Sequence, residues 1–245
     1  MHFSLTESAR SLAHLVLPVR CAICDRALAG DPIPFICRAC WSQLTPLTDP
    51  TCPRCGRPFG SPVATVYTPD LICGECHGRP PAFSKAWSCY RYDSPLKDAI
   101  HLFKYRRKVA LARPLATLLL ARGVDPLDYD LVMPVPLHPD RLREREFNQA
   151  LLLADHLASR LGLPLSYDNL IRTQATPPQS ELSRAARLKN LRRTFGVRQP
   201  AALQAKRILL VDDVFTTGTT VNECAKALRK AGAGPVSACT LARAV

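Results

Sequence analysis

The sequence contains no long apolar run. A membrane-spanning helix needs about 20 consecutive and mostly apolar residues, whereas the best candidate, residues 12–19, is interrupted by His14 and Pro18. The N-terminus also lacks the basic stretch and following apolar stretch of a secretory signal. These absences exclude an integral membrane protein, and we expect no secretory signal.

Acidic and aromatic residues are both scarce. The chain has 33 Lys+Arg against 20 Asp+Glu, a formal net charge of +13. Residues 1–80 hold 7 basic and 6 acidic residues, so the excess lies in the remainder, with 26 and 14. A basic surface favours a nucleotide-like ligand or nucleic acid, although a solvated face has the same composition. Aromatic residues make up 7%, which disfavours a stacking platform for single strands.

The overall balance is that of a globular protein. Hydrophobic residues are 47% and charged residues 22% of 245 residues, which excludes a disordered chain, a fibre and a coiled coil. At roughly 100–200 residues per domain, one or two domains are expected.

Cysteine, in contrast, is abundant in the N-terminal third. Two Cys-x-x-Cys pairs supply the four thiolates of a tetrahedral Zn²⁺ site, so four pairs predict two zinc ribbons. A redox motif or a disulfide scaffold fits four pairs less well. The spacing leaves open whether neighbouring pairs combine or cross-brace. Four-thiolate sites are closed to substrates, and zinc-bound thiolates imply a reducing, cytoplasmic setting. The eight predicted ligands are Cys21, Cys24, Cys37, Cys40, Cys52, Cys55, Cys73 and Cys76.

The chain divides at Pro80 and Pro81. Residues 1–80 are predicted to form a short helix, over 1–18, and the zinc ribbons. Residues 81–245 alternate strands with helices, which predicts an α/β domain with a parallel sheet and helices on both faces. We expect strands at 86–92, 131–135, 207–211 and 236–242, and helices from 95, at 110–122, 141–161 and 221–231. Leu96, Ala99, Ile100 and Phe103 form the apolar face of the first of these helices.

The most informative segment is 208–220. A buried strand ends in Asp212 and Asp213, and a loop of hydroxyl residues with one glycine, Gly218, leads into a helix. Such a loop lies at the carboxyl edge of the sheet, where α/β proteins bind ligands. Its backbone N–H groups and the helix N-terminus suit a phosphate, and the paired carboxylates suit vicinal sugar hydroxyls. The segment therefore predicts a sugar-phosphate site.

Other phosphate motifs are excluded. No lysine follows Gly218, so the loop is not a P-loop, and the chain has no GxGxxG. A simple turn cap at Asp213 is disfavoured, because two adjacent acids at a buried strand end are costly without a partner.

Residues 208–220 closely resemble the 13-residue motif of type I phosphoribosyltransferases, which bind phosphoribosyl pyrophosphate (PRPP) with Mg²⁺. With the cysteine pairs, the whole chain resembles the ComF (competence protein F, GntX-like) family, a double zinc ribbon followed by a phosphoribosyltransferase domain. Further matches are residues 134–138, Arg141, 147–149, 175–179, Asn190 and Phe195.

The resemblance implies roles for individual residues. Asp212 and Asp213 would hold the ribose hydroxyls, and Val214 and Phe215 belong to the same PRPP-binding segment. The 5′-phosphate would be held by Thr216, Thr217, Gly218, Thr219 and Thr220.

Residues 134–138 resemble the loop that faces pyrophosphate. On that side we place Pro136, His138, Arg141 and Arg145, the two arginines lying one helical turn apart. The alternative for the arginines is a solvated face beside Glu144 and Glu146. The family often has glycine where this chain has Glu146. Residues 173–190 resemble the lid over the active site.

Three functions remain open. The favoured one is a PRPP-binding ComF-type protein of natural transformation, contacting single-stranded DNA and DNA-uptake or recombination proteins, as the resemblance implies. The second is an active phosphoribosyltransferase on a nucleobase or amine, although no acceptor pocket or catalytic residue is identified. The third is a structural adaptor, which PRPP binding would argue against.

Overall fold

The computed structural model describes residues 19–28, 30–48, 50–66, 68, 70–173 and 194–244. The helix expected at residues 1–18 and nearly all of the predicted lid therefore lie outside the described residues. Among the residues that are described, no helix has the length and apolar character to cross a bilayer.

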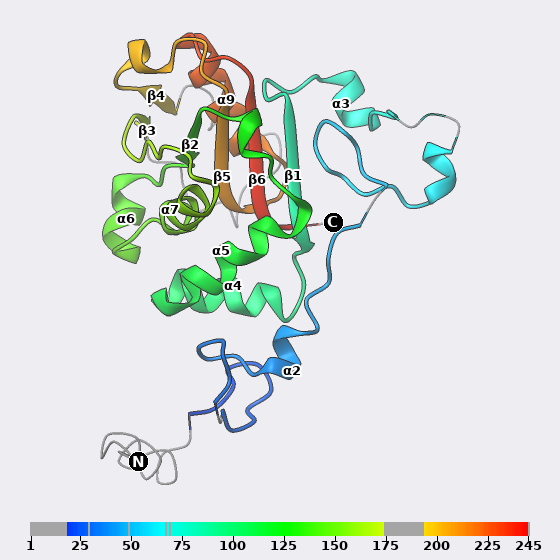
Figure 1. The fold of residues 1–245 in the computed structure, drawn as a ribbon, viewed down its shortest axis with the longest axis vertical. Coiled ribbons are helices and arrows are strands. Elements are labelled where there is room, and N and C mark those ends of the chain that lie inside the picture. The colour runs from blue at the N-terminus through cyan, green and yellow to red at the C-terminus, as the bar shows by residue number, and fades with distance from the viewer. Residues whose placement is uncertain are drawn as a thin grey trace.

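A four-stranded parallel sheet forms the centre of the α/β region (Figure 1). Its order is β1 (Lys85–Arg91), β6 (Val236–Arg243), β5 (Ile208–Phe215) and β2 (Leu131–Pro134). Strand β6 is buried along its whole length, and β5 along most of it. A strand covered on both faces needs apolar side chains in every direction, which explains the continuous apolar run at the start of β5.

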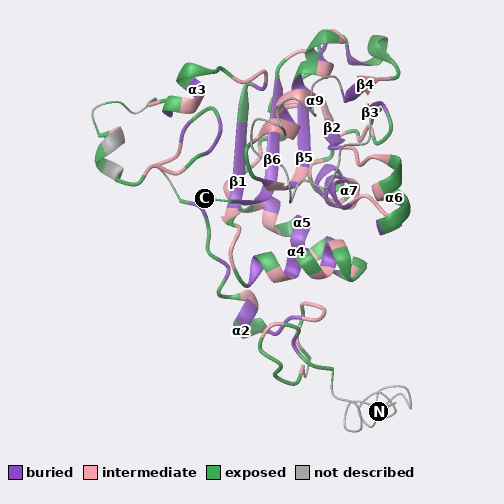
Figure 2. Ribbon diagram, turned by 180° about the vertical axis from the view of Figure 1, so that it is seen from behind, coloured by how far each residue is buried: buried purple, intermediate pink, exposed green. Residues whose placement is uncertain are grey.

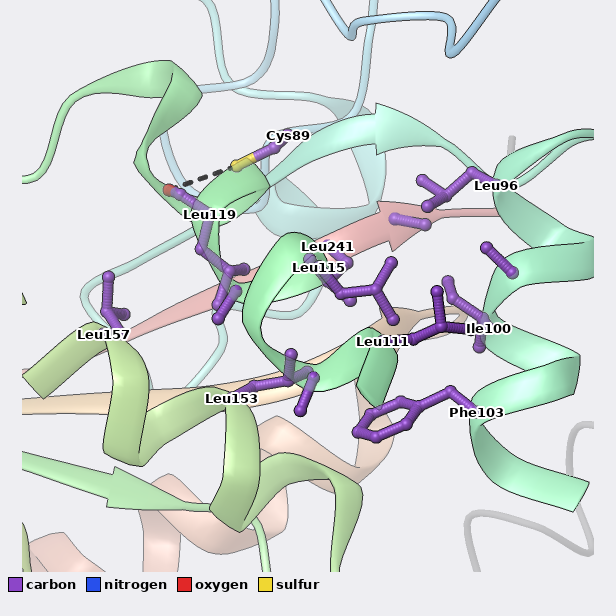
Figure 3. Packing of buried hydrophobic residues seen from close by; sticks show 14 of the residues in the cluster. Cys89, Leu96, Ile100, Phe103, Leu111, Leu115, Leu119, Leu153, Leu157 and Leu241 are labelled. Carbon is purple, nitrogen blue, oxygen red and sulfur yellow. Dashed lines mark hydrogen bonds between the residues drawn. The ribbon is translucent and has the colours of Figure 1, made fainter. Parts of the chain in front are cut away.

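Helices cover both faces of the sheet. Leu209 and Val211 of β5 pack with α4 (Leu96–Tyr105), α5 (Ala112–Leu118) and α7 (Gln149–Leu161). Ile208 and Leu210 point the opposite way, toward α9 (Thr219–Lys230). Figure 3 shows the first of these layers. The predicted apolar face of α4 is confirmed, since all four of its residues are buried.

The helix predicted over residues 141–161 is wrong, because the structure has two helices there, α6 (Pro139–Arg145) and α7. Glu146 ends α6 in the left-handed region with φ of +68°. Asn148 then starts α7 by accepting a hydrogen bond from the Ala150 N–H at 3.0 Å. A side-chain cap of this kind satisfies a backbone donor that has no intrahelical partner.

Three other boundaries differ. The helix expected at 110–122 is α5 flanked by 3-10 turns at Val109–Leu111 and Leu119–Arg122. Strand β5 continues through the acidic pair to Phe215, and α9 begins at Thr219. An antiparallel pair, β3 (Leu170–Arg172) and β4 (Phe195–Val197), was not predicted. Strands of three residues are too short to show a period.

Part of the cysteine-rich region lies along the edge of the sheet. The region contains two short helices, α2 (Arg38–Trp41) and α3 (Gly74–Gly78), and the part with α3 lies beside β1 (Figure 1). The Leu47 N–H donates to Cys89 O at 2.9 Å, and the Ala86 N–H donates to Arg54 O at 2.7 Å. These bonds cover an edge strand that is otherwise open to pairing. Figure 2 shows the contrast between the buried strands and these more exposed loops.

Candidate functional site

The eight predicted zinc ligands form two clusters of four thiols. In each cluster the sulfur atoms lie within 4.8 Å of one another. Neighbouring Cys-x-x-Cys pairs combine, which decides against the cross-braced arrangement. One cluster is Cys21, Cys24, Cys37 and Cys40, and the other is Cys52, Cys55, Cys73 and Cys76.

In each cluster the surroundings favour the thiolate form of some sulfur atoms and the thiol form of others. The Cys37 N–H donates to Cys21 Sγ at 3.3 Å, and the Cys73 N–H donates to Cys52 Sγ at 3.4 Å. Burial alone would raise the pKa of Cys21, but bonds from backbone N–H groups outweigh it and lower the pKa to about 6. The same balance lowers the pKa of Cys52 to about 7. Burial and the neighbouring sulfur atoms instead raise the pKa of Cys40 and of Cys76. Four convergent thiols with such donors fit structural zinc and leave no position open for a substrate.

The predicted ligand loop lies at the carboxyl edge of the central strand. Asp213 is buried and Asp212 half-buried at the end of β5, and Thr216 and Thr217 are exposed. Gly218 is the N-cap of α9 and has no side chain to occupy the free N–H groups of the first turn. The loop thus presents hydroxyls and a helix N-terminus beside two carboxylates, which is the chemistry that a sugar phosphate requires.

Gly218 is needed for two reasons. Its φ is +72°, a region that side chains disfavour, and an added Cβ would lie 2.4 Å from Cζ of Phe215. The loop backbone therefore rests directly on the Phe215 ring. The Thr217 and Thr219 hydroxyls are 2.8 Å apart, so both lie on one side of the loop.

Lys104 completes the acidic end of β5. Its Nζ lies 2.6 Å from Asp213 Oδ2, and both side chains are largely buried. Burial would lower the pKa of Lys104, but the Asp213 carboxylate outweighs it, and the net pKa is raised. Lys104 is therefore charged at neutral pH. Burial and the Asp213 charge raise the pKa of Asp212 to about 7.

The sequence analysis did not identify Lys104, which begins the basic run Lys-Tyr-Arg-Arg-Lys at residues 104–108. A signal was present: Leu96, Ile100 and Lys104 are spaced by four, so Lys104 continues the buried face of α4. The rest of the run has other contacts. Arg107 pairs with Glu146 at 2.8 Å. Lys108 Nζ lies 4.6 Å from the ring centroid of Phe35, which belongs to the first zinc module, the segment that holds the first four-cysteine cluster.

The residues predicted on the pyrophosphate side differ from one another in burial and in their contacts. His138 caps α6, its Nδ1 accepting from the Asp140 N–H at 3.3 Å. Arg141 is half-buried on α6. Arg145 is buried rather than solvated, bonds Gln149 Oε1 at 3.1 Å, and stacks on Tyr105 at 5.0 Å.

A cavity of about 640 Å³ adjoins the loop of residues 134–138. Its walls come from α6, α7 and β3 and include Pro136, Leu137, Phe147, Tyr167 and Arg172. The sequence did not reveal it, because the cavity depends on β3, a strand too short to predict.

Comparison with known proteins agrees with this architecture. Residues 12–77 match the double zinc ribbon domain, and residues 148–244 match the phosphoribosyl transferase domain. The fold and the two matches define a phosphoribosyltransferase-type protein that carries a double zinc ribbon.

Two curated relatives span most of the chain. The chain is 35% identical over 237 residues to the DNA utilization protein YhgH of Salmonella typhi, covering 94% of this chain and 99% of the relative. It is 32% identical over 216 residues to competence protein F of Haemophilus influenzae, covering 85% and 90%. The chain therefore belongs to the ComF family. It is also similar to orotate phosphoribosyltransferase from Aeropyrum pernix, at 22% identity, covering 59% of this chain and 64% of that structure, with a TM-score of 0.34.

Proposed function

We propose that this protein binds PRPP with Mg²⁺ and acts in DNA uptake and use in the cytoplasm. The observation that carries the proposal is the loop between β5 and α9, where a helix N-terminus and threonine hydroxyls stand beside Asp212 and Asp213. We further propose that residues 81–245 form the ligand-binding domain and residues 1–80 the zinc-binding one.

Each part of the loop has a distinct task in this proposal. The N–H groups and hydroxyls of residues 216–220 bind the 5′-phosphate. Asp212 and Asp213 accept hydrogen bonds from the ribose hydroxyls, and Lys104 holds the Asp213 side chain in place. Arg141, with Pro136 and His138 beside it, faces the pyrophosphate, while Arg145 supports this side from within. When bound, Mg²⁺ neutralises charge on the pyrophosphate.

The DNA part rests on family membership and charge. The relatives are named for competence and DNA utilization, and the net charge is +13. Single-stranded DNA and DNA-uptake or recombination proteins are the proposed partners. At the end of α4, Arg106 and Arg107 are both exposed, and the contacts of Arg107 with Glu146 and with the main-chain oxygen of Glu144 lie at the surface, so both side chains are accessible to phosphates.

A second candidate, phosphoribosyl transfer to a nucleobase or amine, is favoured by the cavity beside Pro136. Its volume of about 640 Å³ is sufficient for a small acceptor. Release of pyrophosphate that saturates with one acceptor would support this activity.

Calorimetric titration of PRPP with Mg²⁺ into the zinc-loaded protein tests the proposed site. We expect Asp212→Asn with Asp213→Asn to abolish binding, whereas Asp155→Asn, which neutralises an exposed acid on α7, leaves it unchanged. Equal affinity in the double variant and the wild type would show that the acidic pair is not part of the site.

A further inference from the structure

The second zinc module, with Cys52, Cys55, Cys73 and Cys76, contacts β6, the neighbour of the strand that leads into the ligand loop. Arg243, at the end of β6, is buried and donates from Nη1 to the main-chain oxygen of Cys55 at 2.7 Å. The central carbon of the same guanidinium group, Cζ, lies 4.6 Å from the centroid of the Phe215 ring. One side chain therefore joins a predicted zinc ligand to the last residue of β5.

Phe215 is the platform on which the ligand loop rests. It is buried, pairs with Arg243 in the register of β5 and β6, and fills the space beside Gly218. Any displacement of this ring changes the support of the Gly218 backbone, because no Cβ separates the two. The position of Arg243 thus affects the loop through a single intervening side chain.

Residues 82 and 83, which follow the second zinc module, also contact the elements on either side of the ligand loop. Phe83 packs edge-on against Phe215, with ring centroids 6.3 Å apart. The neighbouring Ala82 N–H donates to Asn222 Oδ1 in the first turns of α9 at 2.8 Å. Both sides of the ligand loop, its strand and its helix, are therefore in contact with residues adjoining the module.

We propose that Arg243 is a positioning residue that makes the geometry of the ligand loop depend on the second zinc centre. A four-thiolate zinc centre carries net negative charge, which favours a guanidinium at its main chain. Arginine suits this position because its planar group can stack on a ring and donate in its own plane at the same time. Lysine keeps the charge but lacks that geometry. The consequence for PRPP rests on the function proposed above.

Hydrogen exchange of the full-length, zinc-loaded protein tests the link without any ligand. In Arg243→Lys we expect two zinc ions per chain to remain bound and the amides of residues 215–222 to exchange about tenfold faster, the effect of losing one charged hydrogen bond. Amides of α7 should not change. The control is Arg91→Lys, because Arg91 is the register partner of Arg243 on β1 but is exposed and pairs with Asp93.

A double-variant cycle separates positioning from a general loss of structure. Cys76→Ser, which removes one ligand of the second centre, should speed exchange at 215–222 by itself, and adding it to Arg243→Lys should give little further increase. Fully additive effects, or wild-type exchange at 215–222 in Arg243→Lys, would overturn the proposal.

Binding measurements distinguish this inference from the proposed function. PRPP affinity should fall about tenfold in Arg243→Lys and stay at the wild-type value in Arg91→Lys. If exchange responds as expected but the wild type itself does not bind PRPP, the proposed function fails and the link through Arg243 stands. If the wild type binds PRPP and Arg243→Lys binds equally well, the link is wrong and the proposed function stands.

Discussion

At the scale of single residues, the acidic end of β5 depends on one lysine. Asp213 is buried, and Lys104 Nζ lies 2.6 Å from its carboxylate. Removing one partner of a buried pair leaves an uncompensated charge, which costs more than the pair itself contributes. The pair therefore holds the Asp213 side chain in a fixed position at the end of β5.

Lys104→Met should lower the free energy of unfolding by about 3 kcal/mol. Combining it with Asp213→Asn should recover much of that loss, because neither variant side chain is then charged. Urea denaturation of Lys104→Met, Asp213→Asn, the double variant and the wild type gives the comparison. Equal destabilisation in Lys104→Met and in the double variant would mean that the charge of Asp213 plays no part.

Asp212 predicts a pH dependence of binding. Burial and the charge of Asp213 raise its pKa to about 7, so the carboxylate form that accepts ribose hydroxyls is lost as the pH falls through that value. The affinity for PRPP should therefore increase as the pH rises from about 6 to about 8. The phosphate groups titrate in the same range, so the test is the difference between the wild type and Asp212→Asn. Parallel pH profiles would contradict this assignment.

At the scale of elements, the break between α6 and α7 shapes the wall of the cavity. Glu146 occupies a left-handed position, with φ of +68°. The glycine that the family resemblance leads one to expect here would adopt this conformation without strain. The exposed side chain of Glu146 pairs with Arg107 at 2.8 Å.

Glu146→Gly and Glu146→Ala both lose that ion pair, but only glycine relieves the backbone. We expect the glycine variant to be more stable than the alanine variant by about 1 kcal/mol. Thermal unfolding of the two proteins measures this difference. Equal stability would show that the left-handed conformation at this position carries no cost.

The elements differ in how far the sequence predicted them. Strands β5 and β6 and the face of α4 follow from apolar patterns that nothing overrides. The split at Glu146 could not be predicted, because a glutamate gives no signal of a positive φ. The loop at 216–218 was located from residue types, but the partner of Asp213 was not, since a contact between α4 and β5 depends on how the two elements pack.

At the scale of the whole molecule, the zinc modules are part of the sheet assembly. The segment between the two modules bonds to the main chain of β1, and so does the knuckle at Arg54. The cysteine clusters belong to the same two apolar cores as the helices. The sequence predicted the eight ligands. It did not show which pairs combine or that the modules cover β1, because both depend on contacts distant in the chain.

Metal analysis should find two zinc ions per chain. Cys52→Ser should reduce this to one, because zinc binding and folding of a four-thiolate site are coupled, and should speed hydrogen exchange at Ala86, whose N–H bonds to Arg54. Cys224→Ser is the control, since Cys224 is buried on α9 and belongs to neither cluster. Retention of two zinc ions in Cys52→Ser would contradict the assignment of this ligand.

The central claim is that the loop between β5 and α9 binds PRPP. The most direct test compares PRPP with ribose 5-phosphate, each with Mg²⁺, by calorimetric titration into the wild-type zinc-loaded protein. We expect saturable binding of both at one site per chain, with PRPP the tighter ligand because it also reaches the loop that carries Pro136 and His138. If neither PRPP nor ribose 5-phosphate binds, the claim is contradicted.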